Sequence, residues 1–290
     1  MDALGGLDLA WPRPVSHHQP VELPLHLPVL VQAYADPIAI PWVAVHGGRL
    51  LGASGRPTPK HRRRPLREVY RLDAGTRLAL ELYVEDRVLE GVWGRRGQLL
   101  DELLELGFDL VLAPNFSVWR DAPRFEQLLQ IRRSIIWFHE AIEAGLRVLP
   151  DIGWSLWEPD GRLWAEWVNS QPDLRAISIF CGGKRIHAER RAHQETVEDI
   201  ARFHEEVRSE VTFVLGGVSS PWRLLDYRRA APGRRLVICN GQAYALAQRR
   251  RLLSSDVAAG GLSARECFLR NCAWIEDAYA AILGSDVDAV

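Results

Sequence analysis

The stretch VTFVLGGVSS, residues 211–220, is a short apolar run that ends at glycine and serine. Four runs of the same kind occur in the chain: DLVLAPN at 109–115, LRVLPD at 146–151, RAISIFCGG at 175–183 and RLVICNG at 235–241. Near-continuous apolar runs of this length are typical of parallel strands buried on both faces. Small and polar residues follow each run, where the active-site loops of parallel barrels lie. The pattern therefore predicts an α/β fold with loops at one end of the sheet.

Two more strands are expected nearer the amino terminus. The run IAIPWVAVHGG, residues 38–48, predicts a strand that ends at His46, Gly47 and Gly48. The run LALELYVED, residues 78–86, predicts one that ends at Glu85 and Asp86. An eighth strand comes either from LPVLVQAYA, which begins at Leu27, or from a segment hidden in a loop. Apolar residues at three- and four-residue steps mark helices between the strands. We therefore predict a TIM-like (β/α) barrel with seven clear strands and an uncertain eighth, in preference to an open doubly wound sheet.

The whole-chain properties fit one globular domain. A barrel of about 250 residues would use most of the 290 residues, so we expect an N-terminal arm over 1–28 and a single barrel domain over 29–290. With a formal net charge of −1, the chain as a whole has no electrostatic field that would attract nucleic acid or a membrane surface. There is no apolar stretch of membrane-spanning length, no secretory leader and no CxxC spacing among the four cysteines, which favours a cytoplasmic protein without a membrane partner.

Polar residues that follow the strands are the candidates for catalysis. Asp151 comes directly after Pro150 at a strand end, where a carboxylate is a nucleophile, a base or simply a cap of the next turn. Only one of the adjacent Glu85 and Asp86 can point into a barrel mouth, and it would pair with Asp151 for glycosidic-bond chemistry unless both are ordinary loop acids. Asn115 completes the predicted catalytic set. Cys181 is a further candidate nucleophile, although the sequence assigns it no histidine partner.

Glycines and helix starts after the last two barrel strands predict an anion site. Glycine lets backbone amides approach a ligand, and the amino end of a helix binds phosphate oxygens. The alternative is an ordinary tight turn between strand and helix. Tryptophans just beyond the predicted strands would stack a ring of the ligand, or would only cover the core. The predicted substrate-binding residues are Gly216, Gly217, Ser219, Ser220, Asn240, Gly241, Trp119 and Trp154.

A basic run occupies the loop between the two upstream strands. A solvated loop is one interpretation; contact with nucleic-acid phosphates is the other, because guanidinium groups bind phosphate oxygens in pairs. The predicted nucleic-acid-binding residues are Lys60, Arg62, Arg63 and Arg64. The histidines, cysteines and acids share no metal-ligand spacing, and nucleotide-binding glycine motifs are absent, so no metal and no cofactor is expected.

The segment PNFSVWRDAPRFEQLLQIRRSIIWFHEAIEAGLRVLPDIGW, residues 114–154, resembles the uncharacterised prokaryotic domain-of-unknown-function family four-four-one-seven, found also in phages and mobile elements. The shared pattern is an aromatic residue and serine after a strand, an arginine-containing helix, and a strand that ends in proline before a tryptophan. It continues weakly through GGVSS and NGQAY and covers about half of the chain. The resemblance implies no known activity. The positions that match its recurrent polar and aromatic points are Asn115, Ser117, Arg124, Arg133 and Trp154, whereas Asp151 departs from the Thr or His that is more usual there.

The sequence therefore leaves three functions open. The first is an enzyme, acting on glycosidic bonds of a phosphate- and ring-containing substrate such as a nucleotide, a nucleic-acid base or a sugar phosphate. The second is a non-catalytic protein of a mobile element that binds nucleic acid or a partner protein. The third is a hydrolase of neutral carbohydrate, which would need no phosphate. The oligomeric state is not predicted.

Overall fold

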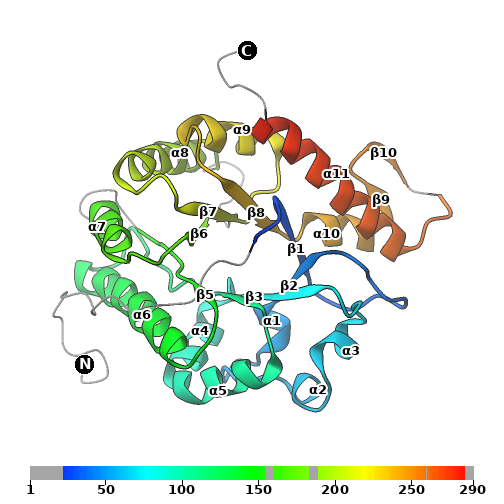
Figure 1. Cartoon of the computed structure of the whole chain (residues 1–290), viewed down its shortest axis with the longest axis horizontal. Coiled ribbons are helices and arrows are strands. Elements are labelled where there is room, and N and C mark those ends of the chain that lie inside the picture. The colour runs from blue at the N-terminus through cyan, green and yellow to red at the C-terminus, as the bar shows by residue number, and fades with distance from the viewer. Residues whose placement is uncertain (1–21, 155–159, 183–188, 259, 285–290) are drawn as a thin grey trace.

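The computed structural model describes residues 22–154, 160–182, 189–258 and 260–284. Within these ranges, eight strands form one sheet in the order β5-β4-β3-β2-β1-β8-β7-β6, and each neighbouring pair is parallel. The strands curl into a barrel, and the helices lie around its outside (Figure 1). The predicted TIM-like barrel is confirmed, and the uncertain eighth strand is β1, at His26–Leu30.

The strands and helices alternate along the chain as the apolar pattern predicts. The barrel strands are β1 (His26–Leu30), β2 (Trp42–His46), β3 (Arg77–Glu81), β4 (Leu110–Leu112), β5 (Val148–Leu149), β6 (Ala176–Phe180), β7 (Thr212–Gly216) and β8 (Leu236–Asn240). The helices are α1 (Gly47–Leu50), α2 (Pro59–Arg62), α3 (Leu66–Tyr70), α4 (Asp86–Gly94), α5 (Arg96–Leu106), α6 (Arg124–Glu143), α7 (Arg162–Ser170), α8 (Glu189–Glu206), α9 (Pro221–Ala230), α10 (Gln242–Gln248) and α11 (Ala264–Gly284). A two-stranded hairpin, β9 (Arg251–Leu252) with β10 (Ser255–Ala258), precedes α11.

The barrel closes between β5 and β6 through main-chain contacts just beyond the short β5. A parallel bridge joins Asp151 to Ser178. The Ser178 amide donates to the Pro150 oxygen at 2.9 Å, and the Ile152 amide donates to the Ser178 oxygen at 2.8 Å. Asp151 is therefore part of the seam that makes the sheet a closed barrel.

Two apolar cores follow from the alternation of side chains along each strand. Small and medium residues such as Ala44, Ala79 and Val214 fill the inside of the barrel. The larger core lies between the barrel and its helices and includes Leu80, Phe138 and Phe213. Polar groups that enter the barrel from the strand ends therefore lie next to a dry interior.

The first strand is held by the far end of the chain. β1 pairs with β2 on one side and with β8 on the other, so that His26 lies opposite Ile238. The carboxylate of Glu276, on α11, accepts hydrogen bonds from the amides of Leu25 and His26 at 3.3 and 3.0 Å. β1 runs across the expected boundary between residues 28 and 29, and most of the expected arm lies outside the described residues.

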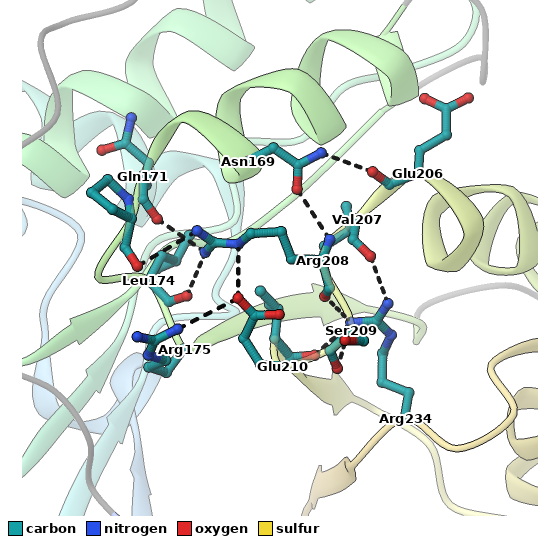
Figure 2. Close-up of polar contacts among 12 residues, drawn as sticks. Asn169, Gln171, Leu174, Arg175, Glu206, Val207, Arg208, Ser209, Glu210 and Arg234 are labelled. Carbon is teal, nitrogen blue, oxygen red and sulfur yellow. Dashed lines mark hydrogen bonds and ion pairs between the residues drawn. The ribbon is translucent and has the colours of Figure 1, made fainter.

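Arginine side chains connect the loops at the amino-terminal ends of β6, β7 and β8 (Figure 2). Arg234 is 4% exposed and donates from both terminal nitrogens to the main-chain oxygens of His204, Val207, Arg208 and Val211 at 2.7–3.0 Å. Arg208 donates in turn to the oxygens of Gln171 and Leu174 at 3.0 and 2.8 Å. We name Arg208 and Arg234, with the carbonyls they bind, the arginine lock. The carbonyls that it binds lie at helix ends or just before strands. The arginine lock therefore holds the connections from α7 to β6 and from α8 to β7 in place.

No helix among the described residues combines the length and apolar character that crossing a membrane requires.

Candidate active site

Asp151 is a buried carboxylate at the carboxyl end of β5. Its side chain is 2% exposed and accepts hydrogen bonds from Asn115 Nδ2 at 2.7 Å and from the Ser178 hydroxyl at 3.2 Å. Burial raises the pKa of Asp151 to about 7, and the hydrogen bonds from Asn115 and Ser178 oppose this rise. A carboxyl group with this pKa exchanges protons readily near neutrality.

A second buried carboxylate, Glu81, ends β3 two strands away. It is 5% exposed, and its Oε2 lies 2.7 Å from Nδ1 of His46, the last residue of β2. Burial raises the pKa of Glu81, while the hydrogen bond and the charge of His46 lower it. The hydrogen bond to Glu81 raises the pKa of His46. This contact favours a charged carboxylate beside a protonated imidazole.

Tyr83 covers the interior of the barrel between the two carboxylates. Its ring packs on Phe180, with 4.8 Å between the ring centroids, and its hydroxyl is buried without a hydrogen bond of good geometry to any described residue. The hydroxyl is nevertheless close enough to Asp151 to lower the pKa of that carboxyl. Burial, and then the charge of Asp151, raise the pKa of Tyr83, so this phenol stays protonated.

Arg133, on α6, supports the loop that carries Asn115. It is 5% exposed and makes a two-pronged ion pair with Glu90, at 2.7 and 2.8 Å. Its guanidinium group also lies over the rings of Trp93 and Phe116, 4.9 Å from each centroid. Because Phe116 follows Asn115 directly, this packing fixes the amide that bonds to Asp151.

A cleft of about 420 Å³ opens beside this cluster, between the loops that follow β4, β5 and β6. Trp119, Trp154 and Phe180 contribute aromatic walls, and Asn115 lines the edge nearest Asp151. Trp119 is 58% exposed, whereas Trp154 is fixed by a hydrogen bond from Nε1 to Asp199 at 2.9 Å. Carboxylates of Glu195 and Asp199 and the guanidinium of Arg120 complete the rim. This shape fits a ring held between aromatic side chains.

Of the expected catalytic residues, Asp151 and Asn115 meet, but the predicted strand end at Glu85 and Asp86 is wrong. β3 ends at Glu81; Glu85 lies before α4 and Asp86 begins it, and both are exposed. Asp86 does lie near the cleft, because its Oδ1 accepts a hydrogen bond from Ser117 at 3.1 Å. The buried carboxylate on this strand is Glu81, which the sequence analysis did not select.

Gly216, the last residue of β7, and Gly217, which follows it, both have structural roles. A Cβ on Gly216 would lie 2.3 Å from Cε2 of Tyr83, so the glycine makes room for the tyrosine ring. Gly217 has a φ of +77°, and a Cβ there would lie 2.8 Å from the Cα of Gly182. Valine at residue 217 would therefore strain this turn, since a β-branched side chain strongly disfavours a positive φ.

The predicted anion site has fewer free amides than expected. The Gly217 amide already donates to the Cys239 oxygen at 2.9 Å, and the Gln242 amide donates to Oδ1 of Asn240 at 3.0 Å. Ser220 precedes α9, and its side chain makes no capping hydrogen bond to the helix. Ser219 is exposed, and Gly241 precedes α10. Phosphate binding at these residues stays a prediction.

The basic run lies at the other end of the barrel. Lys60, Arg62, Arg63 and Arg64 are exposed. Arg62–Arg64 border a cleft of about 520 Å³ whose walls include Leu78, near the start of β3, and Gly107, just before β4. Glu102 and Glu105 also line this cleft. The basic run therefore does not contribute to the mouth that holds Asp151.

The family model of a domain of unknown function, DUF4417, matches residues 65–202, about half of the chain. The chain belongs to this family through that segment. The match includes β3 to β6 and most of α8, and so contains Glu81, Tyr83, Asn115 and Asp151 but not the segment after β7. A search of curated proteins finds no match. The DUF4417 segment therefore supplies the acidic half of the mouth, and its description assigns no reaction.

Proposed function

We propose that the mouth is the active site of an enzyme that transfers a proton to or from a ring-bearing substrate, with Asp151 as the acid or base. The observation that carries this proposal is a buried carboxyl group with a pKa of about 7 beside an aromatic cleft. Perturbed pKa values in clefts are a feature of functional sites. A structural carboxylate would be expected to have a charged partner, whereas the hydrogen-bond donors to Asp151 among the described residues are neutral.

The two buried carboxylates support cleavage of a glycosidic bond as the reaction. Such cleavage uses one carboxylic acid that protonates the leaving group and one carboxylate that stabilises or attacks the sugar. Asp151 suits the acid role, because it is largely protonated below pH 7. Glu81 suits the charged role, because His46 favours its ionised form.

The cleft supports a substrate with a flat or sugar ring. Trp119 and Trp154 both contribute aromatic side chains to the lining, and Asn115 lines the cleft and bonds to Asp151. A substrate group that replaces Asp151 as the partner of the Asn115 amide would bring the bond to be cleaved to the carboxyl group. Phosphate groups on that substrate would extend toward the Ser219 side of the mouth, as expected from the sequence.

The test is a turnover screen with 4-nitrophenyl glycosides, nucleosides, nucleoside monophosphates and sugar phosphates, following release of nitrophenol, base or sugar. We expect cleavage in at least one class, with a rate that falls as the pH rises above about 7, because Asp151 then loses its proton. Asp151→Asn should reduce kcat/KM at least about 100-fold, the usual contribution of general acid catalysis.

Asp121→Asn is the matched control, because Asp121 is an exposed acid in the loop before α6. It should retain full activity. Trp119→Ala should raise KM about 10-fold with little change in kcat, as expected for loss of ring stacking. Full activity in Asp151→Asn, or no turnover of any class, would reject the proposal. Cleavage of 4-nitrophenyl glycosides alone would favour the neutral-carbohydrate alternative.

The cleft at the basic run favours a second function, binding of nucleic acid. Three adjacent exposed arginines border a concave surface, which suits a phosphate backbone. Replacing Arg62, Arg63 and Arg64 by alanine should weaken binding of a labelled oligonucleotide and flatten its salt dependence. Unchanged affinity, or affinity independent of salt, would remove this function without affecting the first.

A further inference from the structure

The basic run forms a ridge between two clefts. The ridge consists of α2, α3 and the turn that joins them, and the two helices lie side by side (Figure 1). Arg62 and Arg63 border the cleft of about 520 Å³, and Lys60 borders a second cleft of about 370 Å³. Arg64 borders both clefts. We name residues 59–70 the basic ridge, and its cations lie on both of its flanks.

A buried histidine holds the basic ridge in a fixed shape. His61 is 5% exposed, and its Nδ1 lies 2.7 Å from the Thr58 hydroxyl oxygen. Its Nε2 lies 3.2 Å from the hydroxyl oxygen of Tyr70, at the end of α3, and the two rings stack with 5.6 Å between their centroids. The cations beside His61 are therefore placed before any ligand arrives, which lowers the cost of ordering them on binding.

The positive charge of the basic ridge is largely available to a ligand. Among the described residues, Lys60, Arg62 and Arg63 have no carboxylate partner, and Arg64 has an exposed one, Glu68, at 3.5 Å. An ion pair between exposed groups contributes little and exchanges readily. Because the whole chain has a formal net charge of −1, a polyanion is attracted by this local concentration of charge and not by the protein as a whole.

The clefts beside the basic ridge offer little to an unpaired nucleobase. The aromatic rings among the residues that line them are Tyr34 and His61, which are only 7% and 5% exposed. Proteins that bind single strands stack the bases on accessible aromatic side chains. Glu102 and Glu105 line the larger cleft and would repel phosphates there. A phosphate chain therefore fits along the flanks of the ridge and not in the larger cleft.

We propose that the basic ridge enters a groove of a nucleic-acid duplex, so that Arg62 and Arg63 contact the phosphates of one strand and Lys60 contacts those of the other. Cations on two flanks match two phosphate chains, whereas a single strand would use one flank. Arg64 lies between the strands. The inference rests on the second proposed function, binding of nucleic acid, and names its partner as double-stranded. Contacts to phosphates alone carry no sequence information, so binding is independent of sequence.

The test compares two labelled DNA probes by fluorescence anisotropy over a range of salt concentrations. One is a duplex of about 20 base pairs and the other an oligothymidine strand of about 40 nucleotides, so that the number of phosphates is similar. We expect the duplex to bind at least about 10-fold more tightly, with a slope of log affinity against log salt of about −3, as for three phosphate contacts.

Three results would overturn the inference. Equal or tighter binding of the oligothymidine strand would reject the duplex and leave binding of nucleic acid standing. No salt-dependent binding of either probe would remove both. Equally tight binding of a polyglutamate peptide in place of the duplex would show that the ridge attracts any polyanion.

Lys60→Gln tests the second flank. It should weaken duplex binding about 5-fold at about 50 mM salt and reduce the salt slope by about 1, and it should leave the weaker single-strand binding unchanged. Lys60 is exposed, so the fold should persist. Arg229→Gln, at an exposed arginine on α9 that borders neither cleft, is the matched control and should bind like the unmodified chain. Unchanged duplex affinity in Lys60→Gln would reject the two-strand arrangement.

Discussion

The two ends of the barrel use buried polar groups in opposite ways. At the amino-terminal end, the guanidinium groups of the arginine lock donate hydrogen bonds to main-chain oxygens. Arg234 alone binds four of these oxygens, at 2.7–3.0 Å. At the mouth, Asp151 is equally buried, but within the part of the chain that the structure describes its donors are neutral and the Tyr83 hydroxyl lacks a well-placed partner. Satisfied groups stabilise a fold, whereas incompletely satisfied ones store free energy that a ligand can release. The buried polar groups at the amino-terminal end therefore stabilise the fold, whereas those at the mouth are available to a ligand.

The largest expected effect comes from removing the lock. Arg234→Met keeps much of the side-chain volume but leaves four carbonyls without this donor, in two buried and two part-buried hydrogen bonds. We expect a loss of about 4 kcal/mol in the free energy of unfolding, since each buried group left unpaired costs about 1 to 3 kcal/mol and relaxation recovers part of it. Urea denaturation would measure it. Arg229→Met, at an exposed arginine on α9, is the control; an equal loss there would break the comparison.

The next effect has the opposite sign and depends on pH. The pKa of Asp151 is about 7 in the folded protein against an ordinary value of 3.8, so ionisation of Asp151 destabilises the fold. This cost is absent below pH 3.8, grows as the pH rises, and is complete above about pH 7. It amounts to about 4 kcal/mol at about 1.4 kcal/mol per pH unit, which is an upper value for a hydrogen-bonded group.

Asp151→Asn should therefore be more stable than the unmodified chain at pH 8 by as much as about 4 kcal/mol, and similar to it at pH 4. Urea denaturation of both proteins across this range would measure the difference. Parallel pH profiles would mean that Asp151 is an ordinary structural residue, and the contrast between the two ends would lose its main support.

The smallest effect concerns His46. Its pKa is raised by Glu81, so the stability that it contributes is fully present below pH 6.5 and is lost as the pH rises through its folded-state pKa. His46→Gln should cost about 1 kcal/mol at pH 6 and nearly nothing at pH 9, given that the imidazole is partly exposed. A cost that is the same at both pH values would show that His46 acts by packing alone.

Much of the fold could be predicted because each barrel strand has an apolar run of its own. The site was predicted in part. Asp151 was found because it follows a proline at a strand end, but Glu81 was missed because it lies inside the run LALELYVED. The alternation in that run holds the missing signal, because Ala79, Glu81 and Tyr83 share one face while Leu78, Leu80 and Leu82 share the other. Because Glu81 and Tyr83 are polar and share a face with the small Ala79, that face is the one expected to point into the barrel.

Other parts of the site could not be predicted, because they depend on distant segments. Only glycine fits at residue 216, because the Tyr83 ring lies against it. Tyr83 follows β3 and Gly216 ends β7, so the two residues are far apart in the sequence. Contacts of this kind follow from the closed barrel rather than from any local pattern.

The pairing of β1 with β8 has a consequence for folding during synthesis. During synthesis β1 emerges first, yet its second neighbour, the strand that contains Ile238, and its amide acceptor Glu276 emerge more than 200 residues later. Until then β1 has a free edge, and such edges invite pairing with other chains. Completion of β8 gives β1 its second neighbour, and α11 then supplies Glu276, so a chain cut short before β8 would leave one edge of β1 unpaired.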